Sequence, residues 1–531
     1  MKRLLYQIHR WVGIALALFM TIWFLSGLVI MYAGPSALGR AEQLAGAESL
    51  RPESGWLSAG EAWARSAAQR HALSPADSKK GKDAPLAEAR LVRQGGAPRW
   101  LMEDAAGGRY ALSAVDGSLD PVSLNEAAAI VRQWAGAGES VRYVDTGLQD
   151  SAVRNHEALR PFHRFAVGNG SREVLVSERT GEVVRDSTAF DRTLYWTGNW
   201  IHLMRPLETI GLSPEGRRSV LAWLGFFAFA GSLTGLIIGW QRWRPGWGGR
   251  PTYSQGRTQP YREFWFKWHF WSGLLGGSFA LLWAFSGYLN NNPFSLFSPA
   301  TASKAELARY QGPTVPAAVQ DWRPSAFVTQ DENRDIVELT WRRLGREAVL
   351  IGLTRDGRRL PQPVSGSQPH FSEASLLEAA GRYGNTVPVA RRTLLSSYDD
   401  YYYARHGQGP VDRPLPVLQV DLADAGSTRL YLDPQDGRLL LRQDDSRRTY
   451  RWLWSALHHW DIGWLQHRPL WDAWMLTWVL LGIVLAGSST VIGWKRLRKT
   501  LHADAPKPRP QPARAAPARP TAALAPEGPA P

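Results

Sequence analysis

The sequence predicts an α-helical membrane protein, with a core of four transmembrane helices built as an internal duplication of pseudo-twofold symmetry and with two α+β domains outside the membrane. Four stretches without charged residues are long enough to cross a bilayer as helices, which takes about 20 apolar residues. Motifs around the first two stretches recur around the last two. The four stretches are Trp11 to Tyr32, Ser219 to Gln241, Phe270 to Leu289 and Ala473 to Trp494.

The repeat is clearest around two pairs of histidines. His9 and His269 each stand at the start of an apolar stretch in the pattern His-x-Trp-x-Gly, and a Ser-Gly pair follows each at the same offset. His202 and His458 each stand a short distance before the next apolar stretch. Four histidines at duplicated positions near the membrane edges indicate cofactor ligands.

Basic residues beside the four stretches predict the orientation, because cytoplasmic flanks are enriched in Lys and Arg. They gather before the first stretch, between the second and third, and after the fourth. We therefore expect a multi-pass protein of the bacterial inner membrane, with both termini cytoplasmic and the long segments periplasmic. The first stretch is too long for a typical signal-peptide core, and no small-residue cleavage site follows before Pro35, so we expect it to remain as an anchor.

The expected organisation is helix 1 (1–33), outer domain 1 (34–218), helix 2 (219–241), a basic cytoplasmic loop (242–267), helix 3 (268–290), outer domain 2 (291–472), helix 4 (473–495) and a disordered cytoplasmic tail (496–531). The tail is rich in Pro and Ala and has no apolar periodicity. The stretch His71 to Pro85 also lacks periodicity and is expected to be a surface loop.

Composition excludes several classes of protein. A net charge of +15 is common in nucleic-acid-binding proteins, but much of the basic excess lies where the positive-inside rule places it. We therefore expect membrane lipid and no nucleic acid as a partner. The absence of cysteine excludes disulfides, thiolate-bound iron-sulfur clusters, Cys-ligated zinc and covalently attached c-type haem.

The two outer segments carry the same series of signals. Each has short alternating strands ending at an Asp-Gly turn, a helix with an S-x-x-E capping signal, an Arg-Pro pair and a hairpin. In the first segment these are Arg99 to Met102, Tyr110 to Val115, Ser123 to Glu126, Arg160-Pro161 and Val174 to Val184. In the second they are Ile336 to Trp341, Ala348 to Leu353, Ser375 to Glu378, Arg413-Pro414 and Leu430 to Leu440.

The length of a transmembrane helix decides how the histidines pair. A span is about 30 Å long, so histidines at opposite faces cannot share one iron. The pairs that can form are His9 with His269 at the cytoplasmic face and His202 with His458 at the periplasmic face. Two facing imidazoles are suitable axial ligands of a low-spin b-type haem, which transfers electrons and binds oxygen poorly. We expect two haems per chain, with flanking tryptophans against the porphyrins: Trp11, Trp271, Trp200 and Trp452.

Alternatives remain at several positions. Each histidine could instead be an interfacial residue bonded to backbone beside an aromatic belt, although four matched positions favour ligation. Zinc or copper is less favoured because no carboxylate or fifth histidine recurs at a regular helical offset. His459 is the rival of His458, but it points about 100° away on a helix and the first half has Leu203 there.

Other polar and aromatic residues lack a repeat partner. We interpret His156, His163, His406 and His467 as surface or substrate-side residues. The run Tyr398 to Tyr403, with Arg405, could line a periplasmic substrate cleft, although a half-buried edge strand is the favoured interpretation.

These motifs together resemble the PepSY-associated transmembrane family, which includes inner-membrane ferric-siderophore reductases of the ferrioxamine (Fox) type. The resemblance covers roughly Met1 to Lys499, and the first half has Arg160-Pro161-Phe162-His163 where the second has Arg-Pro-Leu-Pro. The motifs are His-x-Trp-x-Gly at His9 and His269, Arg413 to Pro416, the hairpin Tyr431 to Gly437, Leu457-His458 with Asp461, and the exits Gly239-Trp240-Gln241-Arg242 and Gly493-Trp494-Lys495-Arg496.

The resemblance implies PepSY-like outer domains and a ferric siderophore as the periplasmic electron acceptor. Reduction weakens the hold of hard oxygen ligands on iron, so electron transfer alone would release Fe(II). The sequence shows no paired-carboxylate or Ser/His/Asp signature and identifies no catalytic side chain. It also lacks a G-x-G-x-x-G nucleotide motif, so a quinol or a cytoplasmic flavoprotein docking on the basic loop is the expected donor. The rival hypothesis is a noncatalytic PepSY-type membrane binding protein or siderophore permease with structural histidines.

Overall fold

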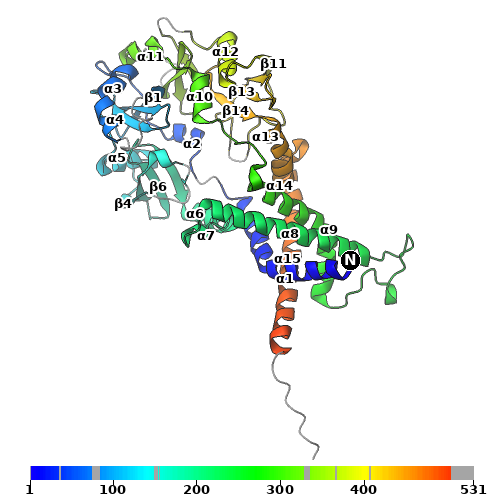
Figure 1. The fold of residues 1–531 in the computed structure, drawn as a ribbon. Helices are drawn as coiled ribbons and strands as arrows, with labels where there is room; N and C mark the ends of the chain where they lie inside the picture. Colours follow the sequence, from blue (N-terminus) through cyan, green and yellow to red (C-terminus); the bar gives the residue numbers. More distant parts are fainter. Residues whose placement is uncertain are drawn as a thin grey trace, which may run out of the picture.

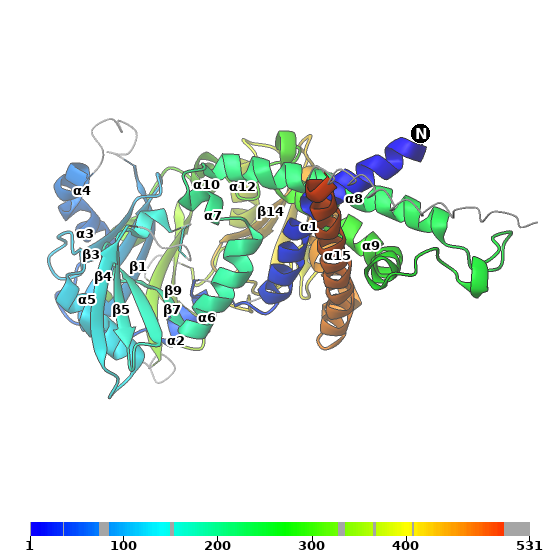
Figure 2. The same ribbon diagram turned by 90° about the horizontal axis from the view of Figure 1, so that it is seen from below.

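The long helices and the β-sheets lie at opposite ends of the molecule in the computed structural model (Figures 1 and 2). The structure describes residues 2–34, 37–73, 84–148, 153–154, 156–327, 335–364, 368–405 and 408–503. Most of the predicted tail and residues 74–83 of the predicted surface loop lie outside the described residues.

Four helices in the described residues are long and apolar enough to cross a membrane: α1 (Lys2–Ile30), α8 (Pro214–Arg242), α9 (Phe264–Asn290) and α15 (Leu470–Ala503). Helices α1 and α9 each pack against both α8 and α15. The four predicted helices are thereby confirmed. Helices α8, α9 and α15 extend beyond their charge-free stretches at both ends, because such a stretch indicates only the part that lies in hydrocarbon. Helix α1 begins earlier than its stretch, at Lys2, but ends at Ile30, two residues before the stretch does.

The four helices run from a loop end to a domain end. The loop end carries the N-terminus and loop 243–263, and the domain end carries the sheets (Figures 1 and 2).

A six-stranded antiparallel sheet joins the two predicted outer domains. Its order is β10-β9-β8-β1-β2-β3, so three strands come from each half of the chain. At the junction β1 pairs with β8, and Arg90 lies opposite Thr340. Its strands are β1 (Leu86–Gln94), β2 (Ala97–Asp104), β3 (Arg109–Ser113), β8 (Ile336–Leu344), β9 (Glu347–Thr354) and β10 (Arg359–Gln362).

The two faces of this sheet differ because side chains alternate along each strand. Leu91, Trp100 and Leu339 are fully buried on the apolar face, in one core with residues of α3 (Ala59–Arg65) and α11 (Ala317–Asp321). The other face carries ion pairs of Arg90: the pair with Glu338 on β8 joins the two halves, and the pair with Glu182 joins β1 to the residue just before Val183 in the same half.

Two further sheets, each of four antiparallel strands in sequence order, complete the outer part. The first contains β4 (Val141–Gly147), β5 (Phe162–Val167), β6 (Arg172–Ser177) and β7 (Val183–Thr188), and the second β11 (Val389–Leu395), β12 (Val417–Leu422), β13 (Arg429–Leu432) and β14 (Leu439–Gln443). Helix α5 (Leu124–Ala135) packs on the first and α12 (Glu373–Tyr383) on the second. The same order of strands and helix thus occurs in each half.

Short helices complete the described chain. They are α2 (Arg40–Ala45), α4 (Ala67–Leu73), α6 (Ala189–Tyr195), α7 (Pro206–Thr209), α10 (Lys304–Gln311), α13 (Asp445–Tyr450), α14 (Leu457–His459), two π-helices (Trp196–Trp200 and Arg451–Ala456) and 3-10 turns at Glu157–Leu159, Ser254–Gly256, Pro293–Ser295, Pro324–Ala326 and Gly463–Gln466.

Local predictions in the outer part had mixed outcomes. The capping box at Ser123 is confirmed, because its side chain accepts from the Glu126 amide and Glu126 accepts from the Ser123 amide. The cap at Ser375 is wrong: α12 begins one turn earlier, and Ser372 accepts from the Ser375 amide. The edge strand expected at residues 398–403 is also wrong, since this segment has no regular structure between β11 and β12.

Candidate functional site

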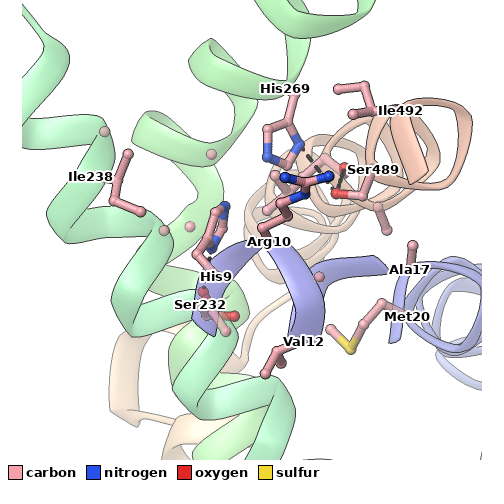
Figure 3. A pocket seen from close by; sticks show the side chains of 18 of the residues that line it. His9, Arg10, Val12, Ala17, Met20, Ser232, Ile238, His269, Ser489 and Ile492 are labelled. Carbon is pink, nitrogen blue, oxygen red and sulfur yellow. Dashed lines mark hydrogen bonds between the residues drawn. The ribbon is translucent and has the colours of Figure 1, made fainter. Parts of the chain in front are cut away.

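His9 of α1 and His269 of α9 face each other near the loop end. Their ring centroids are 6.1 Å apart and their planes are tilted by 38°. Figure 3 shows both rings turned into the same pocket. The Nδ1 atom of His9 lies 3.0 Å from the Gly231 carbonyl oxygen on α8, and Nδ1 of His269 lies 3.1 Å from the Ser489 hydroxyl on α15. Each ring is therefore held by the next of the four long helices along the chain: His9 of α1 by α8, and His269 of α9 by α15.

The pocket between these rings is a cavity of about 350 Å³. A Cβ atom added to Gly235 would lie 2.7 Å from Cε1 of His9, whereas one added to Gly13 would meet nothing within 4 Å. Small residues from all four long helices therefore keep room beside the two imidazoles. Those that line it are Gly13, Ala17, Ala228, Gly231, Ser232, Gly235, Gly239, Gly273, Gly277, Ala280, Ala486, Ser489 and Gly493.

His202 and His458 lie at the domain end, each within two residues of the end of a π-helix. Such turns are rare and often occur at functional sites. The Ser26 hydroxyl of α1 lies 3.1 Å from Nδ1 of His202, and the Ser286 hydroxyl of α9 lies 3.0 Å from Nδ1 of His458. The Ser-Gly pairs that repeat in the sequence are thus the partners of these histidines.

Two tryptophans of the long helices bond to the backbone of the outer histidines. The indole N–H of Trp23 donates to the His202 carbonyl at 3.1 Å, and that of Trp283 donates to the His458 carbonyl at 3.0 Å. A Cβ atom added to Gly287 would lie 3.4 Å from Trp23 and 3.9 Å from His458, so these segments of the two halves lie side by side. No ring contact joins His202 to His458 among the described residues, in contrast to the inner pair.

Trp23 and Trp283 were not predicted from the sequence, which indicated Trp11, Trp271, Trp200 and Trp452 instead. Trp11 and Trp271 do not line the inner cavity, and Trp11 is 57% exposed. Trp452 is also exposed and donates to the Tyr401 hydroxyl at 3.2 Å. The signal that could have identified Trp23 and Trp283 is their equal distance from the repeated Ser-Gly pairs.

The rival His459 lies edge-on to Trp454 and His458, with ring centroids 5.1 and 5.3 Å away. Trp454 instead stacks on His458 at 4.1 Å. Because His458 bonds to Ser286 as His202 bonds to Ser26, the matching environments favour His458 as the repeat partner of His202.

No hydrogen bond or ring contact joins His156, His163 or His467 to either pair in the described part of the chain. His163 is buried in β5, 2.7 Å from the Thr146 hydroxyl, so its interpretation as a surface residue is wrong. His467 is exposed and His156 is half-buried. His406 lies outside the described residues.

The outer histidine segments are also tied to the outer domains. Arg217 of α8 donates to the Leu203 carbonyl at 2.9 Å and pairs with Glu208, which in turn pairs with Arg154 of outer domain 1 at 2.6 Å.

In the second half, the Tyr403 hydroxyl donates to Asp461 just after His459, and Arg451 lies 2.9 Å from the same carboxylate. Burial, opposed by the nearby Arg405, raises the pKa of Tyr403 to about 12, which keeps the phenol a hydrogen-bond donor. The Tyr398 to Tyr403 segment therefore anchors the His458 segment to outer domain 2.

The inner pair has the dimensions of a two-histidine metal centre. An iron atom bonded to two facing imidazoles at about 2 Å each would place the ring centroids about 6 Å apart. In all four histidines Nδ1 is the hydrogen-bonded nitrogen, which orients the ring and leaves Nε2 as the candidate ligand. No group of three or more His, Asp or Glu that could hold a bare metal ion occurs in the described part of the chain. The inner site thus offers two nitrogen donors beside one cavity, without a third His, Asp or Glu ligand in the described residues.

Comparison with known families identifies the chain. A family model described as the PepSY-associated TM region matches residues 6–334, more than half of the sequence. A comparison with curated proteins found no match. The match agrees with the four apolar helices and the separate α+β part, and the chain belongs to the family of proteins with a PepSY-associated transmembrane region.

Proposed function

We propose that this protein binds two b-type haems and passes electrons across the bacterial inner membrane to a periplasmic ferric siderophore. The observation that carries the proposal is the facing pair His9 and His269 beside a cavity between the four long helices. Haem fits this place because its plane needs open space between the two rings, and the glycines and alanines supply that space.

The placement of the two pairs supports a path for electrons. From His9 to Ser26, the partner of His202, α1 rises about 25 Å, close to the thickness of the hydrocarbon core. By the positive-inside rule, the loop end is cytoplasmic and the domain end periplasmic. We further infer that the two halves arose by internal duplication, since matching strands, caps and histidine partners recur in each half.

A bound haem would supply a reversible one-electron change between Fe(III) and Fe(II) at each histidine pair. The chain's residues orient the imidazoles through Nδ1 and surround them with apolar side chains. One electron delivered to the siderophore iron converts its Fe(III) to Fe(II), while the donor, a quinol or a cytoplasmic flavoprotein, loses one. Hard oxygen ligands hold Fe(II) weakly, so release of iron needs no acid-base side chain.

The decisive experiment is a visible spectrum of the purified protein from haem-replete cells, reduced minus oxidised, with pyridine haemochrome quantification. We expect low-spin b-type bands and two haems per polypeptide. A folded but colourless protein would contradict the proposal and favour the noncatalytic binding protein or permease.

The acceptor is tested separately. Dithionite-reduced protein should be reoxidised by a ferric hydroxamate siderophore, with the Fe(II) product trapped by a chelator. The gallium form of the same siderophore has the same shape but no accessible reduction, so it should leave the haems reduced. Equal reoxidation by both forms would exclude the siderophore as acceptor.

A further inference from the structure

Three arginines line the same cavity as His9 and His269, at its loop end: Arg10, Arg242 and Arg496. Within the described part of the chain none of them forms a salt bridge with a carboxylate. The guanidinium of Arg242 donates to the hydroxyl of Tyr261 at 2.7 Å and to that of Tyr6 at 3.2 Å, and both tyrosines also line the cavity. A cavity bordered by cations without anionic partners is suited to bind carboxylates, which arginine recognises with paired N–H donors.

Two of these arginines occupy matching positions of the repeat. Arg242 and Arg496 each end a Gly-Trp-x-Arg motif at the loop end of α8 and of α15. Arg242 lies over the Tyr6 ring at 4.9 Å, and Arg496 lies over the Phe266 ring at 5.6 Å. Tyr6 and Phe266 in turn stand three residues before His9 and His269. The two arginine environments are therefore related in the same way as the two histidines.

Arg10 breaks this symmetry. The matching position in the second half is Phe270, which also lines the cavity. The three cations thus consist of one symmetric pair and one additional charge on the side of α1.

The symmetry of the site constrains how a haem can lie in it. A twofold rotation that exchanges the two axial imidazoles must have its axis in the porphyrin plane. Haem carries two acidic side chains, the propionates, side by side on one edge. If the twofold axis passes between them, the rotation also exchanges the two propionates. A symmetric pair of arginines at one end of the cavity then provides one cation for each propionate.

We propose that Arg242 and Arg496 each bind one propionate of the haem held by His9 and His269, so that the propionate edge points to the loop end, and that Arg10 supplies a third positive charge there. This inference rests on the proposed function and specifies the orientation of the inner haem. Positive charge near the propionates favours the reduced haem, because reduction adds an electron to the site.

The test is a redox titration of purified, delipidated protein carrying Arg242→Gln or Arg496→Gln. Each variant should keep the low-spin spectrum and shift the reduction equilibrium of the inner haem about tenfold toward the oxidised form, equal to about 59 mV for a one-electron couple. The outer haem should not change. Arg244→Gln and Arg498→Gln are matched controls two residues further along the chain, Arg244 just past the end of α8 and Arg498 within α15. Neither lines the cavity, and neither should shift the potential.

Each outcome bears on the inference in a defined way. Unchanged potentials in both Gln variants, in protein that still carries two haems, would overturn the propionate assignment and leave the proposed function intact. A wild-type protein without haem would overturn the proposed function itself. If a Gln variant loses the inner haem, Arg242→Lys or Arg496→Lys should retain it, since the charge is kept; loss in Lys and Gln variants alike would count against the inference. A shift seen only with anionic lipid present would assign the arginines to lipid headgroups instead.

Discussion

The two pairs of histidines occupy opposite ends of the same four helices, but they are held in different ways. His9 and His269 project from continuous helices and face each other at 6.1 Å. His202 and His458 lie in the segments that connect the outer domains to α8 and α15, and no ring contact joins them in the described residues. The inner pair thus depends on helix packing alone, whereas the outer pair also depends on the outer domains.

This difference has a consequence for how the two sites respond to change. Helices packed through small residues fix the distance between the inner imidazoles, because neither helix can move without opening the bundle. The outer histidines each bond to a serine of a long helix. The segments that carry them are tied to the outer domains, the first through the ion pair of Glu208 with Arg154 and the second through the hydrogen bond of Tyr403 to Asp461. Changes in the outer domains should therefore reach the outer site and leave the inner site unaffected.

The largest expected effect is loss of one haem from single histidine variants. If each pair shares one haem iron, as proposed, His9→Ala or His269→Ala should halve the haem content and retain the outer haem. His202→Ala or His458→Ala should then retain the inner one. Pyridine haemochrome and low-temperature difference spectra measure this. His459→Ala is the matched control and should retain both haems.

The outcome that reverses this assignment is specific. If His459→Ala loses a haem while His458→Ala keeps both, then the ligand of the outer pair is His459. If all four single variants keep two haems, the pairing itself is wrong.

A smaller loss is expected from Gly235→Ala, which affects the inner pair alone. The new methyl group would lie 2.7 Å from His9 Cε1 and 3.2 Å from Nδ1, so the imidazole must move from its present position beside Gly231. Turning a side-chain tip hardly affects folding, but it removes the ligand geometry, so most of the inner haem should be lost from folded protein. Gly487→Ala on α15 meets nothing within 4 Å and should behave as wild type. Equal haem content in the two variants would show that His9 is not held as described.

The sequence predicted features that depend on local pattern and missed those that depend on distant pairing. Charge-free stretches predicted all four long helices, because burial in lipid requires a continuous apolar run. The repeat also predicted which histidines share an end of the bundle. The pairing of β1 with β8 could not be predicted, because residues as distant as Arg90 and Thr340 carry no local signal for their contact. The partners of the imidazole rings were not predicted either, although Gly231 and Ser489 both lie in a recurring Ala-Gly-Ser-x-Thr stretch, at residues 230–234 and 486–490.

The outer domains contain a buried ion pair whose effect should be limited to the domain end. Burial by itself would raise the pKa of Glu182, but Arg90 at 2.7 Å lowers it to about 2. The pair therefore contributes fully above pH 4.5, the ordinary value for glutamic acid, and its contribution is lost as the pH falls toward 2. This lowering of the Glu182 pKa from 4.5 to about 2 corresponds to about 3 kcal/mol in the free energy of unfolding.

Glu182→Gln should lower the free energy of unfolding of the outer domains at pH 7. Because the variant has no carboxylate to protonate here, its free energy of unfolding should decrease less than that of the wild type between pH 7 and pH 3. Denaturant titrations followed by far-UV circular dichroism at pH 7 and pH 3 measure both effects. At pH 7 the inner haem should be retained in full. Loss of the inner haem before the outer one would contradict the separation of the two sites.

The smallest effect is expected where one hydrogen bond to a ligand is removed without touching the ligand itself. In Ser26→Ala and Ser286→Ala, Nδ1 of His202 or of His458 loses its hydroxyl partner, so the ring is less well oriented and a weaker ligand. Loss of such a partner typically weakens binding 10–100-fold. Haem transfer to apomyoglobin should therefore become faster for the outer haem, while the inner haem stays at the wild-type rate. Ser272→Ala is the control, because this buried serine on α9 donates to the Trp268 carbonyl of its own helix and has no other side-chain bond among the described residues. Faster loss of haem from both sites in all three variants would mean that the serines act on the packing of the bundle rather than on the histidines. The inner pair, positioned by the helices, and the outer pair, positioned by its neighbours, would then not differ in the way described.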